Sequence, residues 1–177
     1  MTEPRPHRRV VRNRKKNTVP LSKLRTLDAV RTVVDHPRRL EELLRILEDK
    51  DPCVRGRAAA TLARLSESHP ARLLRVTLRL REAIADDSAY VRWHLVYTLG
   101  KLASHSPAQS RGLLNDLVSR LDDENRVVRT VACNALSLVA ARKPVIVEEF
   151  FHNLKKEIPP SVARVLRGSK AKQARSQ

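Results

Sequence analysis

The stretch IADDSAYVR, residues 84–92, has two further copies in the chain, LEDKDPCVR at 47–55 and LDDENRVVR at 121–129. In each copy an apolar residue stands two positions before an Asp, and Val-Arg begins five positions after that Asp. Successive copies are 37 residues apart. A fixed period of this length indicates a repeat architecture, in which each unit packs against its neighbours. Because repeat proteins usually act through extended surfaces, a binding surface is expected rather than a catalytic pocket.

Each repeat unit is predicted to form two helices, which we call helix A and helix B, joined by the repeated turn. Leu, Ala, Val and Arg dominate the composition and there are only four Gly, which favours helix over strand. Pro residues that suit the first turn of a helix recur with the same period of 37, at Pro70, Pro107 and Pro144. Apolar residues at helical spacing follow the turn in every copy, for example Val128, Ala132, Ala135, Leu136 and Val139. The chain is therefore predicted to be all-α.

Pro at the head of helix A, Leu-x-Asp at its end and Val-Arg early in helix B resemble the HEAT-repeat family over about residues 37–158. The resemblance implies a right-handed α-solenoid of helical hairpins, with about three full repeats plus capping helices. It also implies a structural ladder of polar contacts between adjacent repeats, made by Asp49, Asp86, Asp123, Arg55, Arg92 and Arg129. We therefore expect the most repeated charged residues to hold the stack together rather than to bind a ligand.

The two ends of the chain depart from the repeat. Residues 1–20 are predicted to be a basic, disordered arm, and residues 21–36 an amphipathic helix that caps the first repeat. The repeat units are expected at 37–69, 70–106 and 107–143, followed by a half unit at 144–158. Pro159-Pro160 is expected to break the chain, which leaves 159–177 as a basic C-terminal tail with at most a stub of helix B at residues 161–167.

Positive charge is concentrated at the ends. The chain has a net charge of +17 and a pI of about 11.1, of which residues 1–37 contribute +7 and residues 159–177 contribute +5. A charge of this size favours a polyanionic partner, which could be nucleic acid or an acidic protein. The densest run is a candidate polyanion-binding arm, formed by Arg8, Arg9, Arg12, Arg14, Lys15 and Lys16. The alternative is a solvated tail without a dedicated partner.

The second unit carries three of the five aromatic residues, Tyr90, Trp93 and Tyr97, on one face of its helix B. This face lies opposite the apolar positions of the same helix. The resemblance places B helices on the concave surface of the stack, where these rings would suit protein contacts or base stacking. Packing against the arm or the neighbouring helices is the competing interpretation. The candidate concave patch comprises Tyr90, Trp93, Tyr97, His94, Lys101, Arg57 and Arg64.

Several functional classes lack support in the sequence. It has no Gly-rich phosphate loop, no Cys-x-x-Cys pair and no His-Glu-x-x-His motif, so no metal, cofactor or small-molecule substrate is expected. No apolar run is long enough for a membrane span. Cys53 and Cys133 are predicted to be small buried residues, which favours a reducing cytoplasm, and the chain is expected to be a monomer.

We predict a non-catalytic binding scaffold that docks an acidic protein or a nucleic-acid-containing assembly through its basic arms and concave surface. Two alternatives remain. One is a DNA-binding enzyme similar in architecture to the alkylpurine DNA glycosylases, although no Asp faces the concave groove near Trp93 in the predicted arrangement. The other is a protein–protein adaptor whose tails only make it soluble.

Overall fold

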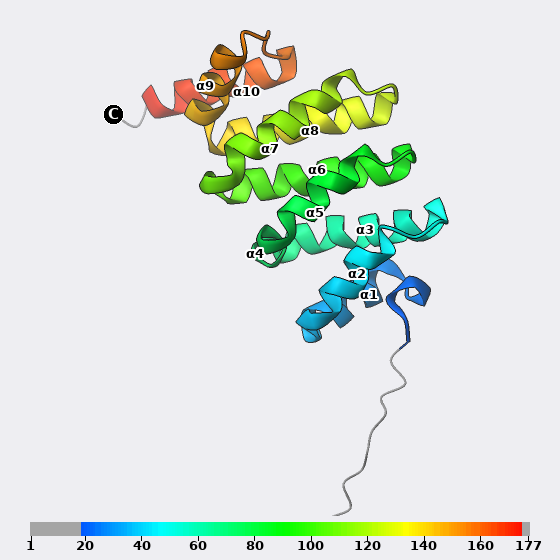
Figure 1. Cartoon of the computed structure of the whole chain (residues 1–177). Coiled ribbons are helices and arrows are strands. Elements are labelled where there is room, and N and C mark those ends of the chain that lie inside the picture. Colours follow the sequence, from blue (N-terminus) through cyan, green and yellow to red (C-terminus); the bar gives the residue numbers. More distant parts are fainter. Residues whose placement is uncertain (1–18, 175–177) are drawn as a thin grey trace, which may run out of the picture.

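The computed structural model describes residues 19–174, and every regular element in that range is a helix (Figure 1). The helices form successive hairpins that stack along one axis, from η1 and α1 at one end to α9 and α10 at the other. In chain order they are η1 (Leu21–Lys23), α1 (Thr26–Asp35), η2 (Pro37–Arg39), α2 (Leu40–Ile46), α3 (Pro52–Ser68), α4 (Pro70–Leu73), η3 (Leu74–Val76), α5 (Thr77–Glu82), η4 (Ala83–Ala85), α6 (Ala89–His105), α7 (Pro107–Ser119), η5 (Arg120–Asp122), α8 (Arg126–Arg142), α9 (Pro144–Leu154) and α10 (Pro160–Ala174). The predicted all-helical solenoid is confirmed.

The B helices are α3, α6, α8 and α10, and the first three are 17 residues long. The N-termini of α3, α6 and α8 follow the repeated turn, where Asp51 and Asn125 accept hydrogen bonds from backbone N–H groups of the first helical turn of α3 and α8. The A helices α4, α7 and α9 begin at Pro70, Pro107 and Pro144, as the spacing of these residues predicted.

Helix A of the second unit is divided into short α and 3₁₀ segments between residues 70 and 85. The division has a local cause at the Leu74 carbonyl. It accepts hydrogen bonds from the Thr77 hydroxyl and from the side-chain amide of Gln109 on the next A helix. These hydrogen bonds compete with the regular α-helical pairing of this carbonyl at the 3₁₀ turn Leu74–Val76.

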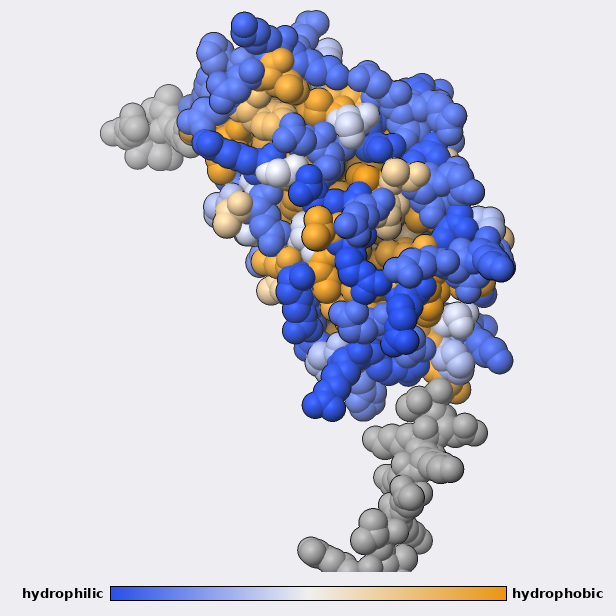
Figure 2. All heavy atoms as spheres, viewed as in Figure 1, coloured by the Kyte–Doolittle hydropathy of each residue, from blue (hydrophilic) through white to orange (hydrophobic). Residues whose placement is uncertain are grey.

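A single apolar core runs through the stack from Leu21 to Leu166. The B helices approach closely, most of all at Gly100 on α6, where a Cβ in place of the glycine hydrogen would lie 2.5 Å from the Cβ of Ala135 on α8. On the outer surface, Figure 2 shows hydrophilic side chains over most of the visible face, with apolar residues between them. Within residues 19–174, no helix is long and apolar enough to cross a membrane.

The C-terminal prediction is wrong over residues 160–174. Instead of a tail that follows a half unit, this segment forms α10, which packs against α8 and completes a fourth hairpin with α9. Val162 and Leu166 carry the packing, because they stand one helical turn apart and are 0% and 4% exposed. Pro160, expected to break the chain, instead occupies the first turn of the helix.

At the other end, the predicted capping helix is split into η1 and α1, and α1 packs against α3. The polyanion-binding arm proposed from the sequence lies outside the described residues.

Candidate binding surface on the concave face

The repeated Asp and Arg stabilise the turns between helices A and B. Asp86 accepts a hydrogen bond from the backbone N–H of Ser88, two residues later, at 2.8 Å. The guanidinium of Arg92 donates to the carbonyls of Asp86 and Asp87 at 3.0 and 2.9 Å. The same contacts recur in the other two copies, through Asp49 and Arg55 and through Asp123 and Arg129. Each repeated pair therefore closes its own turn.

The Arg residues of the first two copies also bridge to the next repeat. Arg55 donates to the Asp86 carboxylate at 2.7 and 3.0 Å, and it also contacts Asp87. Arg92 donates to both carboxylate oxygens of Asp123, at 3.0 and 2.9 Å, where both side chains are buried. Among the described residues no such bridge reaches Asp49 or leaves Arg129. The ladder therefore has two rungs.

These contacts keep the rung carboxylates ionised. Burial alone would raise the pKa of Asp123, but hydrogen bonds from Arg92 and the Asn125 N–H outweigh it and hold the pKa below its usual value. The pKa of Asp86 is lowered in the same way, with burial opposed by Arg55 and the Ser88 N–H. The pKa of Arg92 is raised, mainly by its hydrogen bonds to Asp123. At neutral pH each rung is thus an ion pair between an ionised Asp and a protonated Arg of adjacent repeats.

The aromatic residues of α6 form one cluster. The rings of Tyr90 and Trp93 meet edge to face at 5.7 Å, and the Trp93 ring stacks on His94 with centroids 3.5 Å apart. Tyr90 is 52% exposed and lies over Gly56 of α3, where the missing side chain leaves room for the ring. Trp93 and Tyr97 are half-buried. The cluster therefore packs partly on the neighbouring repeat and keeps part of its ring surface open.

His94 is buried, whereas the sequence placed it in the exposed concave patch. It is only 6% exposed, because its ring lies between Trp93 and Tyr90 and its Nδ1 atom is 2.8 Å from the Tyr90 carbonyl oxygen. Burial lowers the pKa of His94, although the Tyr90 carbonyl opposes the shift. His94 is thus a neutral ring that supports Trp93 from behind.

Trp93 and Tyr97 open into a cavity of about 470 Å³, which we call the aromatic hollow. Three helices enclose it: α1, α3 and α6. Its lining consists of Thr26, Leu27, Ala60, Ala63, Arg64, Glu67, Trp93, His94 and Tyr97. The small side chains of Ala60 and Ala63 leave the space, and Leu27 of α1 stands at its border with 62% of its surface exposed. The contribution of α1 could not be foreseen, since the sequence pattern did not show where that helix would pack.

Glu67 brings a carboxylate into the hollow that sequence analysis missed. It accepts hydrogen bonds from the Tyr97 hydroxyl at 2.8 Å and from Arg64 at 3.1 Å. Burial would raise the pKa of Glu67, but these two hydrogen bonds hold it below its usual value. Burial and the adjacent carboxylate together raise the pKa of Tyr97 to about 12. The glutamate is therefore ionised and the phenol stays a hydrogen-bond donor at neutral pH.

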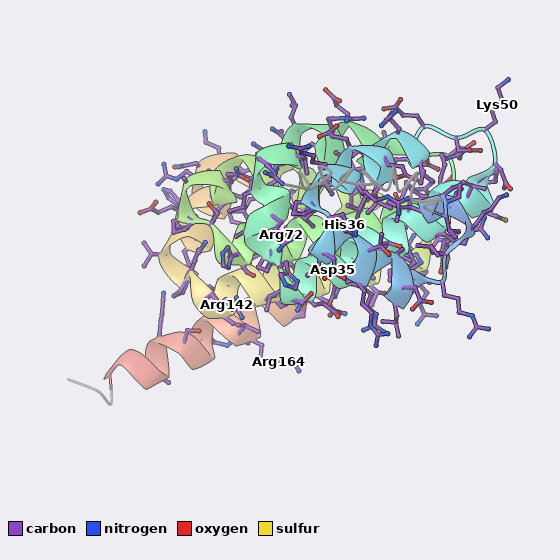
Figure 3. The ribbon with its side chains drawn as sticks, turned by 90° about the horizontal axis from the view of Figure 1, so that it is seen from below. Asp35, His36, Lys50, Arg72, Arg142 and Arg164 are labelled. Atoms are coloured by element: carbon purple, nitrogen blue, oxygen red, sulfur yellow. The ribbon has the colours of Figure 1, made fainter. Side chains whose placement is uncertain are left out.

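Cations surround the aromatic hollow. The Lys101 ammonium lies over the Tyr97 ring, 5.1 Å from its centroid, and Arg64 is largely exposed on α3. Arg57 is exposed nearer to the start of α3, outside the lining. In the fourth hairpin Arg164 of α10 extends away from the stack (Figure 3). Of the predicted concave patch, the hollow thus contains Trp93, Tyr97, His94 and Arg64, with Lys101 beside it and with Tyr90 and Arg57 outside.

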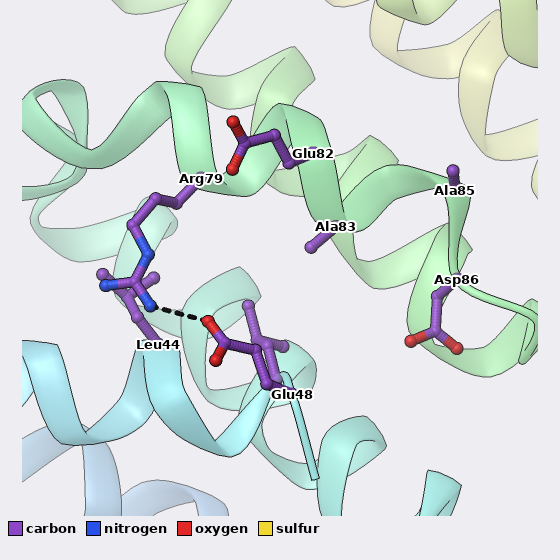
Figure 4. A pocket seen from close by; sticks show the side chains of 8 residues that line it. Leu44, Glu48, Arg79, Glu82, Ala83, Ala85 and Asp86 are labelled. Atoms are coloured by element: carbon purple, nitrogen blue, oxygen red, sulfur yellow. Dashed lines mark hydrogen bonds and ion pairs between the residues drawn. The ribbon is translucent and has the colours of Figure 1, made fainter. Parts of the chain in front are cut away.

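A second cavity, of about 380 Å³, lies between α2 and the segment α5–η4 on the A-helix side (Figure 4). Its rim is acidic, with Glu48, Glu82 and Asp86. Arg79 crosses it and pairs with Glu48 and with Glu41, each at 2.9 Å. Further ion pairs join the later A helices, between Arg81 and Asp116 and between Arg111 and Glu149. Arg79, Arg81 and Arg111 on this side are therefore used in ion pairs between repeats, whereas Arg38, Arg45 and Arg75 pair with no carboxylate among the described residues.

Within the described part of the chain, the His, Cys, Asp and Glu side chains do not assemble into a metal site. There, no group of three or more His, Cys, Asp or Glu side chains could hold a metal ion. The prediction that both cysteines are buried is wrong for Cys53, which is exposed because it falls in the first turn of α3, facing solvent. Cys133 is half-buried, with its Sγ atom 3.2 Å from the Ser161 hydroxyl.

Comparison with known families identifies the repeat. Residues 70–164 match the family model of the non-SMC mitotic condensation complex subunit 1. The chain belongs to this family. The matched segment of the condensation-subunit family runs from α4 into α10, so it includes Trp93 and Tyr97 but not the α1 and α3 walls of the hollow. No curated protein matches the sequence.

Solved structures similar to this member of the condensation-subunit family share its fold. A designed armadillo repeat protein in complex with the peptide (KR)4 matches with a TM-score of 0.57 and 17% identity, over 84% of this chain and 69% of that one. A computationally designed armadillo repeat protein for modular peptide recognition matches with a TM-score of 0.58 and 19% identity, over 81% and 68%. At this level of identity the likeness concerns the helical-repeat fold alone.

Proposed function

We propose that this chain is a non-catalytic binding scaffold that docks a polyanionic partner on the concave surface of its B helices. The observation that carries the proposal is the surplus of cations around the aromatic hollow. Arg64 and Glu67 of the lining pair with each other, Lys101 stands beside Tyr97, and Arg57 is exposed further along α3, so two cations near the hollow are left without an ion-pair partner among the described residues. Exposed aromatic surface next to such cations suits a partner that is both anionic and partly apolar.

The balance of charge differs between the two sides of the stack. On the A-helix side, the cations Arg79, Arg81 and Arg111 are paired with carboxylates of neighbouring repeats. On the concave side, Arg57 and Lys101 have no carboxylate partner among the described residues. Cations without a partner attract anions more strongly than paired ones, because a paired charge is already compensated. We favour the concave side as the docking surface for a polyanion, because its unpaired cations lie next to exposed aromatic surface.

The designed armadillo protein offers an instructive contrast, because it is in complex with a basic peptide, (KR)4. A partner of the opposite charge is expected here, since cations outnumber carboxylates around the hollow. The matched family is described as a subunit of a complex, which supports a role for this chain inside a larger assembly. With a net charge of +17, we favour an assembly that contains nucleic acid over one of acidic protein alone.

The basic arm would add affinity without specificity. Arg8, Arg9, Arg12, Arg14, Lys15 and Lys16 can contact phosphates in a way that depends on salt and not on base sequence. We further propose that the chain acts as a monomer in a reducing compartment, which suits the exposed thiol of Cys53.

The test compares two triple variants of the full chain that carry the same net charge. Arg57, Arg64 and Lys101 are changed to Gln in the concave variant, and Arg45, Lys50 and Lys155 in the control variant. Binding to DNA and to single-stranded oligonucleotides is measured over a range of salt concentrations. Each lost phosphate contact reduces the magnitude of the negative slope of log K against log salt by roughly 0.7 to 0.9. The slope of the concave variant should therefore be smaller in magnitude by about 2.

The control variant should change the slope much less, because its three side chains lie on the A-helix side or in the turns. Equal losses in the two variants would mean that only net charge matters and would contradict the concave surface as the docking site. A third variant with the six arm cations changed to Ser measures the arm separately. Release of methylated bases from DNA by the unmodified chain would instead favour the glycosylase-like alternative.

A further inference from the structure

We propose that the aromatic hollow binds one unpaired nucleotide of a single-stranded nucleic acid. The base would lie against Trp93 and Tyr97, and the flanking phosphates against Arg64 and Lys101. This inference rests on the proposed function, because it names the part of the polyanion that the concave surface recognises.

The shape of the hollow suits a flat, largely apolar group. Its volume of about 470 Å³ falls within the usual range for sites that hold small ligands, roughly 300 to 1,000 Å³. Trp93 is held in place from behind by the buried ring of His94, so its orientation is set before a ligand arrives. Stacking of a base on such a ring tolerates any base, because every base has an aromatic face.

The polar groups of the hollow complement the edge and the backbone of a nucleotide. Glu67 is ionised and held by Tyr97 and Arg64, which leaves further lone pairs on its oxygens to accept hydrogen bonds from N–H groups on the edge of a base. Arg64 and Lys101 stand on the two helices that flank the cavity, at equivalent positions one repeat apart. A strand that places its base between them can bring a phosphate to each.

A nucleotide fits these features better than an acidic peptide does. Carboxylates would satisfy Arg64 and Lys101, but they would leave the Trp93 face and the exposed Leu27 side chain uncovered. A duplex is equally unsuited, because its bases are stacked on one another and do not present a free face. The hollow should therefore discriminate single strands from both.

Trp93 is the only tryptophan in the chain, so its fluorescence reports directly on the hollow. The full chain is titrated with an oligothymidylate, with a duplex of equal length and with oligoglutamate of equal charge. Only the single strand is expected to quench the fluorescence at saturation. Quenching by oligoglutamate to the same extent, or binding of the single strand without any quenching, would overturn the proposal.

Two pairs of variants separate the hollow from the general surface. Ala60→Leu fills the hollow and should weaken single-strand binding about ten-fold or more, whereas Asn134→Leu, at the equivalent position two repeats later, should leave it within about two-fold. Leu27→Glu adds a negative charge at an exposed position of the hollow, and Val127→Glu adds one at an exposed position of α8 outside it. The first should weaken binding more than the second.

Circular dichroism establishes that each variant is folded, and Leu27→Glu, on a solvent-facing side chain, decides the matter if Ala60→Leu does not fold. Binding that is unaffected by Leu27→Glu, or weakened equally by Val127→Glu, would overturn the nucleotide site. Salt-dependent binding of DNA that persists in this case would leave the proposed function standing, and loss of all polyanion binding by the unmodified chain would defeat both.

Discussion

At the scale of single residues, the repeated Arg carries out two tasks with one guanidinium group. In Arg92, one nitrogen closes the turn of its own repeat, and the other two bind Asp123 of the next repeat. Arg129 keeps only the first task, because it forms no ion pair with a carboxylate of the segment before α10 among the described residues. The repeated Arg therefore contributes unequally to stability along the stack. It bridges two repeats only where the next repeat follows with the same spacing.

The difference between Arg92 and Arg129 predicts unequal losses of stability. Arg92→Met leaves the buried carboxylate of Asp123 without its main partner and should cost about 3–5 kcal/mol. Arg129→Met removes only hydrogen bonds to backbone carbonyls and should cost about 1 kcal/mol. Urea denaturation of both variants provides the measurement, and similar losses would show that the bridge to the next repeat adds nothing.

The candidate site could be predicted from sequence only in part, and single residues show why. Trp93 and Tyr97 can be found because their spacing places them away from the apolar face of α6. The burial of His94 cannot, since a ring that folds back onto its own helix is not visible in a helical periodicity. Glu67 escapes sequence analysis, because its role depends on a hydrogen bond to Tyr97, 30 residues away.

At the scale of helices, the B helices approach one another closely through small residues. Gly100 of α6 faces Ala135 of α8, and a Cβ on Gly100 would lie 3.1 Å from the Ala135 backbone as well as 2.5 Å from its side chain. Because a backbone cannot yield as a flexible side chain can, this contact sets how near α6 and α8 pack.

The close packing predicts opposite effects for the same substitution at two helical glycines. Gly100→Ala should destabilise the chain by about 1–3 kcal/mol through overpacking, even though Ala favours the helix. Gly112→Ala on α7 meets only the Arg81 side chain, at 4.0 Å, and should stabilise by about 0.5–1 kcal/mol. Thermal unfolding measures both, and a stabilising Gly100→Ala would mean that α6 and α8 are not held at this distance.

Among the helices, those within the period of 37 could be predicted from the repeat and α1 from its amphipathic pattern, whereas α10 could be predicted only as a stub. Pro70, Pro107 and Pro144 locate the starts of α4, α7 and α9. The full length of α10 could not be predicted, because Val162 follows Val128 by 34 residues instead of 37 and the segment is strongly basic. Burial of Val162 and Leu166 against α8 outweighs that composition.

At the scale of the whole molecule, the stack separates charges that serve the fold from charges that are available to a partner. Carboxylates in the turns and on the A helices are largely paired across repeats, as in the Arg92–Asp123 and Arg79–Glu48 bridges. The aromatic hollow lies between α1, α3 and α6 and includes Arg64 in its lining, with Lys101 beside it. A polyanion attracted by the net charge of +17 would therefore be directed to the side of the hollow.

The most direct test of this account is to map where a nucleic acid touches the full chain. After ultraviolet cross-linking of a single-stranded oligonucleotide to the protein, mass spectrometry of the digested peptides identifies the attachment points. The account predicts adducts on the concave side of α3 and α6, with Trp93 or Tyr97 among the linked residues. Adducts on α5 and α7, with the α6 rings unlinked, would contradict it.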